Sequence, residues 1–276
     1  MKTRLWCAVL GVLGAWACQK EAAKVPGTTP KPAAPLAPLN AARPEGLDAS
    51  VDEREQLHVI VPLKVQGEKI PAQGEKLTLD DGKCTVGGES FTLDAAADVA
   101  KLKNKLKPGV QLLTAHGDTY MAQVAPLLAL LEEVGAEVWF LHPDEAVAYP
   151  VKLRDEKQFG EWIDEPVPGK LRVVQRSDGF ELTTNMGKLP GLDPNGPTVP
   201  PRGGQMDLST LQNGFVKIKG RFKDAPDVCF LPSYGTPLND TIRAFSANFE
   251  KGDEAIFKQL CLVFPRPGQV AAKKQP

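Results

Sequence analysis

The stretch that decides the fold is VQLLTAHGDTY at residues 110–120, a short apolar run that ends in a polar turn before a helical pattern. A second apolar run, EVWFLHP at 137–143, follows that pattern and ends in proline. The same succession returns downstream as DVCFLPSYGT at 227–236 and LCLVFP at 260–265. Short apolar runs bounded by turn residues are typical of buried strands. We therefore expect one structural unit to occur twice.

The first unit is expected to span residues 57–144 in the order strand, hairpin, helix, strand, helix, strand. Its opening stretch, LHVIVPLKV at 57–65, has the apolar pattern of a mostly buried strand. The dipeptide Asp81-Gly82 supplies the positive φ angles that a tight hairpin turn needs. The hairpin is therefore centred on this dipeptide.

Two helices are predicted to back the strands of the first unit. The first is expected to use Thr92 or Asp94 as its N-cap, because both side chains can accept from exposed backbone amides. The second contains Pro126, which predicts either a kink or a later start.

The second unit, residues 170–266, repeats the order with weaker signals. Its hairpin is centred on Asp178-Gly179, and Asp207 is expected to cap its first helix. The two units together predict an α+β fold built from a strand-hairpin-helix-strand-helix-strand repeat. An unrelated fold for the second unit is the alternative.

The amino-acid composition limits which classes of protein this chain can belong to. The chain has 276 residues, of which 42% are hydrophobic and 24% charged, with a formal net charge of −1. This is enough apolar material for one large or two small cores. A nucleic-acid binder would carry a basic stripe, and the sequence has none. We therefore expect no nucleic-acid partner.

The N-terminus predicts export. A basic start is followed by LWCAVLGVLGAWAC, which is shorter than the roughly 20 residues of a membrane span. Residues 1–17 therefore read as a signal peptide, with Ala15-Trp16-Ala17 as an A-x-A cleavage site. Cleavage at this bond would make Cys18 the first residue of the mature chain.

This N-terminus also resembles the lipobox of bacterial lipoproteins, although Trp16 is bulky where that family has small residues. The resemblance implies lipid attachment to Cys18, and Gln19 after it implies the outer membrane. Ordinary secretion with a free Cys18 is the alternative. Residues 18–56 are rich in proline and alanine and predict a disordered tether, and residues 267–276 predict a flexible tail.

The number and positions of the cysteines fit a protein of an oxidising compartment. Cys7 falls in the signal peptide and lipidation would use Cys18, which leaves Cys84, Cys229 and Cys261. One pair and one free thiol are then expected. Cys229 and Cys261 lie in the two strands that flank the last helix and are the candidate disulfide. Buried free thiols are the alternative.

About a third of the chain, from near Leu57 to Pro143, resembles the periplasmic domain of the ExbD/TolR family. The likeness rests on the hairpin LTLDDGKCTV, on HGDTYMAQV before the second helix, and on Gly135 before the last strand. The second unit matches in pattern, most closely in SYGTPLNDTI at 233–242. The family also carries a membrane helix with an acidic residue, which this sequence lacks. The resemblance implies a non-enzymatic binding role at the envelope, without catalytic residues or a cofactor.

A candidate site follows two neighbouring strands. His116 and Asp118 follow one strand, and His142 and Asp144 follow the next. Because the carboxyl ends of parallel strands meet at one edge of a sheet, these side chains are expected to lie close together. Imidazole and carboxylate are ordinary zinc ligands. A periplasmic metal- or ligand-binding protein is therefore the alternative function, and solvated side chains are the simpler interpretation.

Residues 145–169 are expected to link the two units. They contain a short helical pattern, DEKQFGEWIDE, whose Phe159 and Trp162 would seal the interface between them. The sequence thus predicts an exported protein, and the lipobox resemblance implies an outer-membrane lipoprotein that faces the periplasm and is held to the membrane by its lipid alone. Its expected partner is another envelope protein or peptidoglycan, in an accessory role to an ExbD/TolR-type transport system.

Overall fold

The structure is a computed structural model that describes residues 62–191 and 193–265. All of them fall within one compact unit, Gln56–Pro276. Several predicted features lie outside the described residues: the signal peptide at 1–17, the tether at 18–56 with Cys18, and the tail at 267–276.

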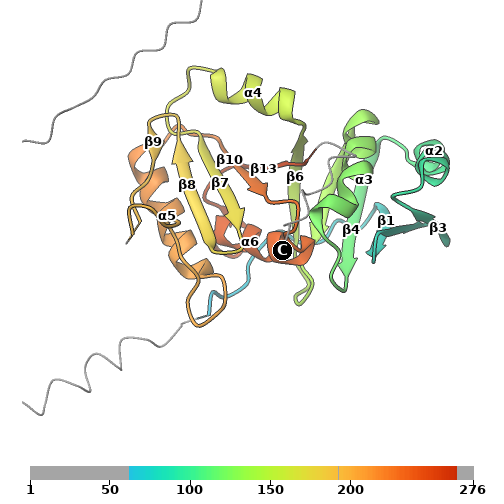
Figure 1. The fold of residues 1–276 in the computed structure, drawn as a ribbon, viewed down its shortest axis with the longest axis horizontal. Helices are drawn as coiled ribbons and strands as arrows, with labels where there is room; N and C mark the ends of the chain where they lie inside the picture. The colour runs from blue at the N-terminus through green and yellow to red at the C-terminus, as the bar shows by residue number, and fades with distance from the viewer. Residues whose placement is uncertain (1–61, 192, 266–276) are drawn as a thin grey trace, which may run out of the picture. The chain divides into compact units, whose positions relative to one another are not determined.

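The described residues form a mixed α+β structure with five α-helices and a large sheet (Figure 1). The first set of elements is β1 (Glu75–Asp80), β2 (Lys83–Val86), β3 (Glu89–Thr92), α2 (Ala96–Lys105), β4 (Gly109–His116), α3 (Met121–Glu133) and β5 (Ala136–Leu141). The second set is β7 (Leu171–Arg176), β8 (Gly179–Thr184), β9 (Gly187–Lys188), α5 (Leu208–Arg221), β10 (Asp227–Pro232), α6 (Leu238–Phe245) and β13 (Gln259–Val263). Between the sets lie β6 (Ala148–Arg154) and α4 (Glu156–Asp164), and the α6–β13 connection holds η2 (Ser246–Asn248), β11 (Phe249–Lys251) and β12 (Glu254–Ala255).

The two sets occupy mirrored places in one sheet of eleven strands, whose order is β3-β2-β1-β4-β5-β6-β13-β10-β7-β8-β9. In the first set β1 pairs antiparallel with β2 and parallel with β4, and β4 pairs parallel with β5. In the second set β7, β8, β10 and β13 pair in the same senses. The same order of elements and the same strand pairing thus occur twice.

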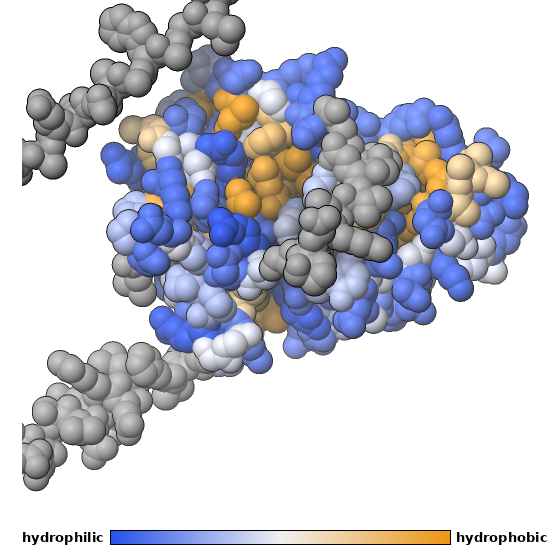
Figure 2. Space-filling view, in the orientation of Figure 1, coloured by the Kyte–Doolittle hydropathy of each residue, from blue (hydrophilic) through white to orange (hydrophobic). Residues whose placement is uncertain are grey.

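The sheet has two unlike faces. Because side chains alternate along a strand, the register places Val138, Val151 and Leu260 on one face. This face carries the main core, to which α2, α3, α5 and α6 contribute. The opposite face carries a smaller apolar cluster built on Trp162 of α4. In Figure 2, apolar residues gather beside α4, over the part of the sheet that holds β10 and β13.

The first hairpin turns where the sequence places it, and the second turns one residue earlier than predicted. Asp81 and Gly82 have φ angles of 41° and 72°, the left-handed values that a two-residue hairpin turn requires. In the second set Arg176 pairs with Gly179, whose φ is 125°, so the two turn residues are Ser177 and Asp178 rather than Asp178 and Gly179. A Cβ on Gly179 would also lie 2.3 Å from the carbonyl oxygen of Val199, so the close approach of this chain segment requires glycine.

The helix boundaries confirm some predictions and correct others. Asp207 caps α5 by accepting from the Thr210 amide, as expected. The predicted cap of α2 is wrong, because its N-cap is Ala95 and no side chain caps it. Pro126 neither delays nor ends α3, which begins at Met121 and continues through it.

Two strand predictions also need correction. In the opening stretch at 57–65, the described residues 62–65 are not a strand, and β1 instead takes the place beside β4. The expected linker at 145–169 contains α4 as predicted, but it also supplies β6, the strand that joins the two sets. Pro150 within β6 has no N–H to donate and made a central strand unlikely from sequence.

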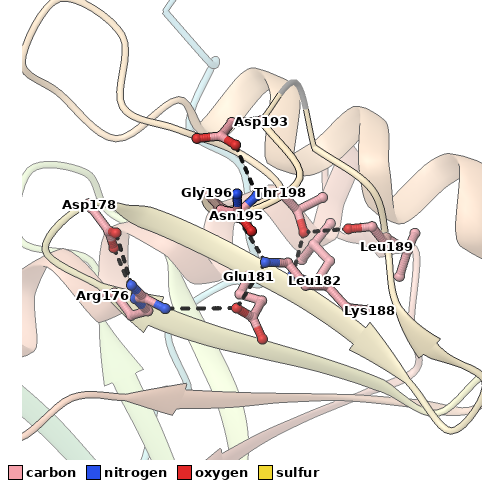
Figure 3. Close-up of polar contacts among 10 residues, drawn as sticks. All are labelled: Arg176, Asp178, Glu181, Leu182, Lys188, Leu189, Asp193, Asn195, Gly196 and Thr198. Carbon is pink, nitrogen blue, oxygen red and sulfur yellow. Dashed lines mark hydrogen bonds and ion pairs between the residues drawn. The ribbon is translucent and has the colours of Figure 1, made fainter. Parts of the chain in front are cut away.

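The loop that follows β9 and contains Thr198 and Val199 covers the β8–β9 edge of the sheet (Figure 3). Val199 pairs with Phe180 through two backbone hydrogen bonds of 2.9 Å. The Thr198 hydroxyl accepts from the Leu182 amide and donates to the Leu189 carbonyl, each at 3.0 Å. These contacts satisfy backbone groups that an open sheet edge would leave unpaired.

Charged side chains surround the same loop in Figure 3. Glu181 lies between Arg176, at 3.8 Å, and Lys188, at 3.4 Å. Arg176 also makes a bidentate contact of 3.0 Å with Asp178. These side chains are partly exposed, and each is matched by an opposite charge. We therefore assign this cluster to stabilising the edge of β7, β8 and β9, where Lys188 also donates to the Gly196 carbonyl of the loop at 2.8 Å.

Two equivalent loops, 117–122 and 233–238, clasp each other at the carboxyl ends of β4 and β10. The Met121 amide donates to the Thr236 carbonyl at 2.9 Å, and the Leu238 amide donates to the Thr119 carbonyl at 2.8 Å. Each donor is the first residue of its helix, and each acceptor lies two residues before the other helix. The contact is therefore reciprocal, as across a twofold axis. We call these two loops the clasp.

The clasp gives a test of how firmly the two sets are joined. Ala122 donates its amide to the Tyr234 carbonyl at 3.0 Å and lies in the first turn of α3, where proline is tolerated. Ala122→Pro is expected to lower the free energy of unfolding by about 1–2 kcal/mol, because it leaves that acceptor without its donor. Ala97→Pro is the control, because Ala97 is exposed and has the same position in the first turn of α2. Equal losses in urea unfolding of the two variants would contradict a stabilising clasp.

Candidate functional site

The four side chains proposed as a metal site do not come together. His116 is exposed on the face of the sheet opposite His142, because Leu113 pairs with Phe140 and side chains alternate from there. Asp118 is exposed as well. Among residues 62–191 and 193–265, no group of three or more His, Cys, Asp or Glu side chains is placed to hold a metal ion. The predicted zinc cluster is therefore wrong.

Asp144 is bound to an arginine instead. Its carboxylate accepts from Nε of Arg243 at 2.8 Å and from Nη2 at 3.3 Å, and Nη1 of Arg243 donates to Asp240 at 3.3 Å. These hydrogen bonds hold the pKa of Asp144 below its usual range and raise the pKa of Arg243. The bidentate pair ties the β5–β6 loop to α6.

His142 is buried at the end of β5, with 6% of its surface exposed. Its Nδ1 accepts the Asp144 amide at 3.1 Å, and its ring lies edge-on to Tyr149, with ring centres 6.2 Å apart. Burial lowers the pKa of His142, and the positive charge of Arg243 adds to this, although the acidic groups Asp144 and Glu145 oppose it. The ring is therefore neutral near pH 7.

A hollow of about 170 Å³ opens beside His142. It lies between the β5–β6 loop, α6, the segment before α5, and the start of the described chain. Its lining residues are Pro62, Leu63, Val65, His142, Asp144, Arg202, Gln205, Met206, Asp207, Leu208, Ser209, Arg243 and Ser246. Most of its lining surface is apolar, as in small-molecule sites, but its volume is below the roughly 300–1,000 Å³ typical of them. This hollow is the candidate functional site.

The acidic groups of the hollow are all paired. Asp207 is almost fully buried and accepts from the Thr210 amide and from the Ser209 hydroxyl, at 2.9 and 2.8 Å. Nε of Arg202 lies 3.3 Å from the same carboxylate. These hydrogen bonds keep the pKa of Asp207 below its usual range despite burial. The carboxylates thus position the arginines and do not offer free ligands.

Sequence reasoning placed two of the lining residues, His142 and Asp144, at the correct strand end, but assigned them the wrong neighbours. It missed Arg243 and Arg202, which carry the positive charge of the site. Arg243 is an ordinary polar residue of an amphipathic helix, and Arg202 lies in a loop rich in proline and glycine. No local signal distinguishes either residue from a solvated side chain.

The cysteine prediction concerned a second part of the molecule. Cys229 and Cys261 are direct partners on the parallel strands β10 and β13, and the structure joins them in a disulfide with an S–S distance of 2.01 Å. Cys84 is the free, buried cysteine of the described chain. The disulfide lies on the face that α4 covers.

Helix α4 covers the disulfide with a buried tryptophan. Trp162 is 2% exposed, packs with both cysteines and Val263, and lies 5.7 Å from the ring of Phe159. We expected Trp162 and Phe159 to seal the interface between the two units. The structure instead shows them packed against β10 and β13 of the second set.

A polar cluster surrounds the indole of Trp162. Its Nε1 donates to Asp227 at 2.9 Å, and the guanidinium of Arg154 lies 5.6 Å from the ring centre and 3.6 Å from the same carboxylate. Lys170 donates to the Trp162 carbonyl and places its ammonium 5.1 Å from the ring centre. The cluster therefore anchors α4, and Arg154 and Trp162 also line a hollow of about 620 Å³.

Comparisons with known proteins leave the family undecided. No protein-family model matches the sequence, and no curated protein is similar enough to serve as a relative. Within the part of the chain that the structure describes, none of the helices has both the length and the apolar character to cross a membrane.

Proposed function

We propose that this chain is a non-enzymatic lipoprotein of the cell envelope whose folded part binds a partner there. In this proposal the signal peptide is removed, Cys18 carries the lipid, and the tether holds a doubled ExbD/TolR-like unit at the outer membrane, facing the periplasm. The partner is another envelope protein or peptidoglycan, and the role is accessory to an ExbD/TolR-type transport system.

The observation that carries this proposal is the mirrored pair of element sets. The two sets have the same order and the same strand pairing, and their equivalent loops exchange backbone hydrogen bonds in the clasp. Two related units that face each other in one chain present two similar surfaces, as a symmetric dimer does with two chains. Such an arrangement favours docking of a partner.

The disulfide supports export. Stable disulfides are typical of secreted and periplasmic proteins and are rare where thiols are kept reduced. The bond between Cys229 and Cys261 is fully buried, with both cysteines 0% exposed. An oxidising compartment is therefore the natural place for this fold.

Cell fractionation tests the envelope part of the proposal. We expect the full chain in the membrane fraction. Detergent is expected to release it, and high salt is not. A Cys18→Ser variant is expected in the soluble periplasmic fraction, because it has no residue to lipidate. Equal distribution of the two proteins, or a mature chain that still begins at Met1, would rule out the lipid anchor.

Binding is tested with the soluble Cys18→Ser protein. Saturable sedimentation with isolated sacculi, displaced by excess unlabelled protein, would identify peptidoglycan as the partner. Crosslinking in intact cells to one envelope protein, with no sacculus binding, would identify a protein partner. If both assays show no saturable binding, the function as a binding module is wrong.

A further inference from the structure

The loop between β5 and β6, residues 142–147, is held closed through the ring of His142. Nδ1 of this ring accepts the Asp144 amide at 3.1 Å, and the His142 amide donates to the Val147 carbonyl at 3.0 Å. An imidazole nitrogen accepts a hydrogen bond only while it carries no proton. Protonation of the ring turns Nδ1 into a donor, so the contact with Asp144 is then lost.

The surroundings of His142 disfavour a charged ring while the loop is closed. The ring is buried, and within the part of the chain that the structure describes its Nε2 has no hydrogen-bond partner. Burial lowers the pKa of His142 most, and Arg243 on α6 lowers it further, whereas Asp144 and Glu145 in the loop raise it. The net change in this pKa is downward, so the closed loop holds the neutral ring.

The other described elements around His142 bring no unpaired charge to it. Tyr149 of β6 lies edge-on to the ring, and burial raises the pKa of its phenol, which stays uncharged. The segment before α5 contributes Arg202 and Asp207 to the hollow that His142 lines, and these two side chains form an ion pair of 3.3 Å. The start of the described chain contributes the uncharged side chains of Pro62, Leu63 and Val65. Among the described residues of the lining, His142 is therefore the group whose charge can change near pH 6.

The closed and open forms of the loop differ in how readily His142 is protonated. Opening returns the ring to water, where the pKa of histidine is about 6.5. Because the open form binds more protons, the closed form is fully stable above about pH 6.5 and loses stability as the pH falls below that value. Opening also breaks the bidentate contact between Asp144 and Arg243, at 2.8 and 3.3 Å, which ties the loop to α6.

We propose that the β5–β6 loop is a pH-sensitive switch, in which protonation of His142 releases the loop from the ring and from α6. In the open form Arg243 is free of its bidentate contact with Asp144. The hollow then loses His142 and Asp144 from its lining, so the side that the loop forms is open to solvent. The switch belongs to the folded part of the chain and does not depend on the partner proposed at the envelope.

Amide hydrogen exchange measures the opening of the loop directly. In the soluble Cys18→Ser protein, the protection of the Asp144 amide is expected to fall about fivefold or more between pH 7.5 and pH 5, after correction for the intrinsic exchange rate. The amide of Leu182, which donates to the Thr198 hydroxyl in the second set, is expected to keep its protection. The carboxylate of Asp144 stays ionised in this range, because its hydrogen bonds with Arg243 lower its pKa.

Two variants separate the titration of the ring from the contact that it makes. In His142→Asn, the side-chain Oδ1 takes the position of Nδ1 and accepts the Asp144 amide, but it does not titrate. This variant is expected to keep the same Asp144 protection from pH 7.5 to pH 5. His116→Asn, which changes an exposed histidine outside the loop, is expected to lose protection as the parent protein does.

Three results would overturn the switch: constant Asp144 protection in the parent protein, an equal fall in His142→Asn, or an equal fall at Leu182. If His142→Asn does not fold, the ring NMR signals of His142 in the parent protein take its place. They are expected to change over the same pH range in which the Asp144 protection falls. Ring signals that stay constant over that range would also overturn the proposal.

Discussion

Replacing both Cys229 and Cys261 with alanine is expected to lower the free energy of unfolding by about 3–4 kcal/mol. The disulfide closes a chain segment with a sequence separation of 32, and this restriction of the unfolded chain is the main source of its stabilisation. Denaturant unfolding of the two proteins measures the difference. The effect is large beside the total stability of an ordinary domain.

Two controls isolate the crosslink from the loss of buried sulfur. Cys84→Ala removes a buried thiol without a crosslink and gives the cost of one such sulfur. A reductant is expected to lower the unfolding midpoint of the unaltered chain and of Cys84→Ala, but not of the double variant. If reduction leaves all three midpoints unchanged, the disulfide does not stabilise the fold.

Trp162→Ala is expected to cost about 3–5 kcal/mol, because it opens a large cavity under α4. The loss also removes the indole N–H that Asp227 accepts at 2.9 Å. Thermal or urea unfolding, followed by circular dichroism, measures the change.

Two further variants separate packing from hydrogen bonding at this position. Trp162→Phe keeps an aromatic ring but loses the N–H, and is expected to cost about 1–2 kcal/mol. Trp139→Ala is the matched control, because Trp139 is only partly buried and donates to the exposed side chain of Glu137. If Trp139→Ala lowers the free energy of unfolding as much as Trp162→Ala does, the buried indole of α4 has no special role in stability.

The order of elements could be predicted because its signals are local. The dipeptide Asp81-Gly82 sets the hairpin turn through its φ angles, and Asp207 caps α5 through its own side chain. Alternating or continuous apolar runs gave β4, β5, β10 and β13 at nearly their observed bounds. β6 was missed because Pro150 weakens its pattern, and only its two neighbours in the sheet reveal it as a central strand.

The candidate site was predicted only in part, because its members come from distant segments. The sequence places His142 and Asp144 at a strand end, but the direction of each side chain depends on the register between β4 and β5. Because side chains alternate along a strand, this register puts His116 on the face of the sheet opposite His142, outside the site. Arg243 lies 99 residues from Asp144 in the sequence and meets it only through the packing of α6.

The sequence was sufficient to predict the α+β class and the order of most elements, and to name Cys229 and Cys261 as the candidate disulfide. Turn dipeptides, helix caps and the periodicity of apolar residues depend on residues close in sequence, so they can be predicted without a structure. Only the folded structure shows that both sets share one sheet, that β6 joins them, and that His142 and His116 lie on opposite faces. These features depend on strand register and helix packing, which are set by burial summed over the whole core and not by any short stretch of chain.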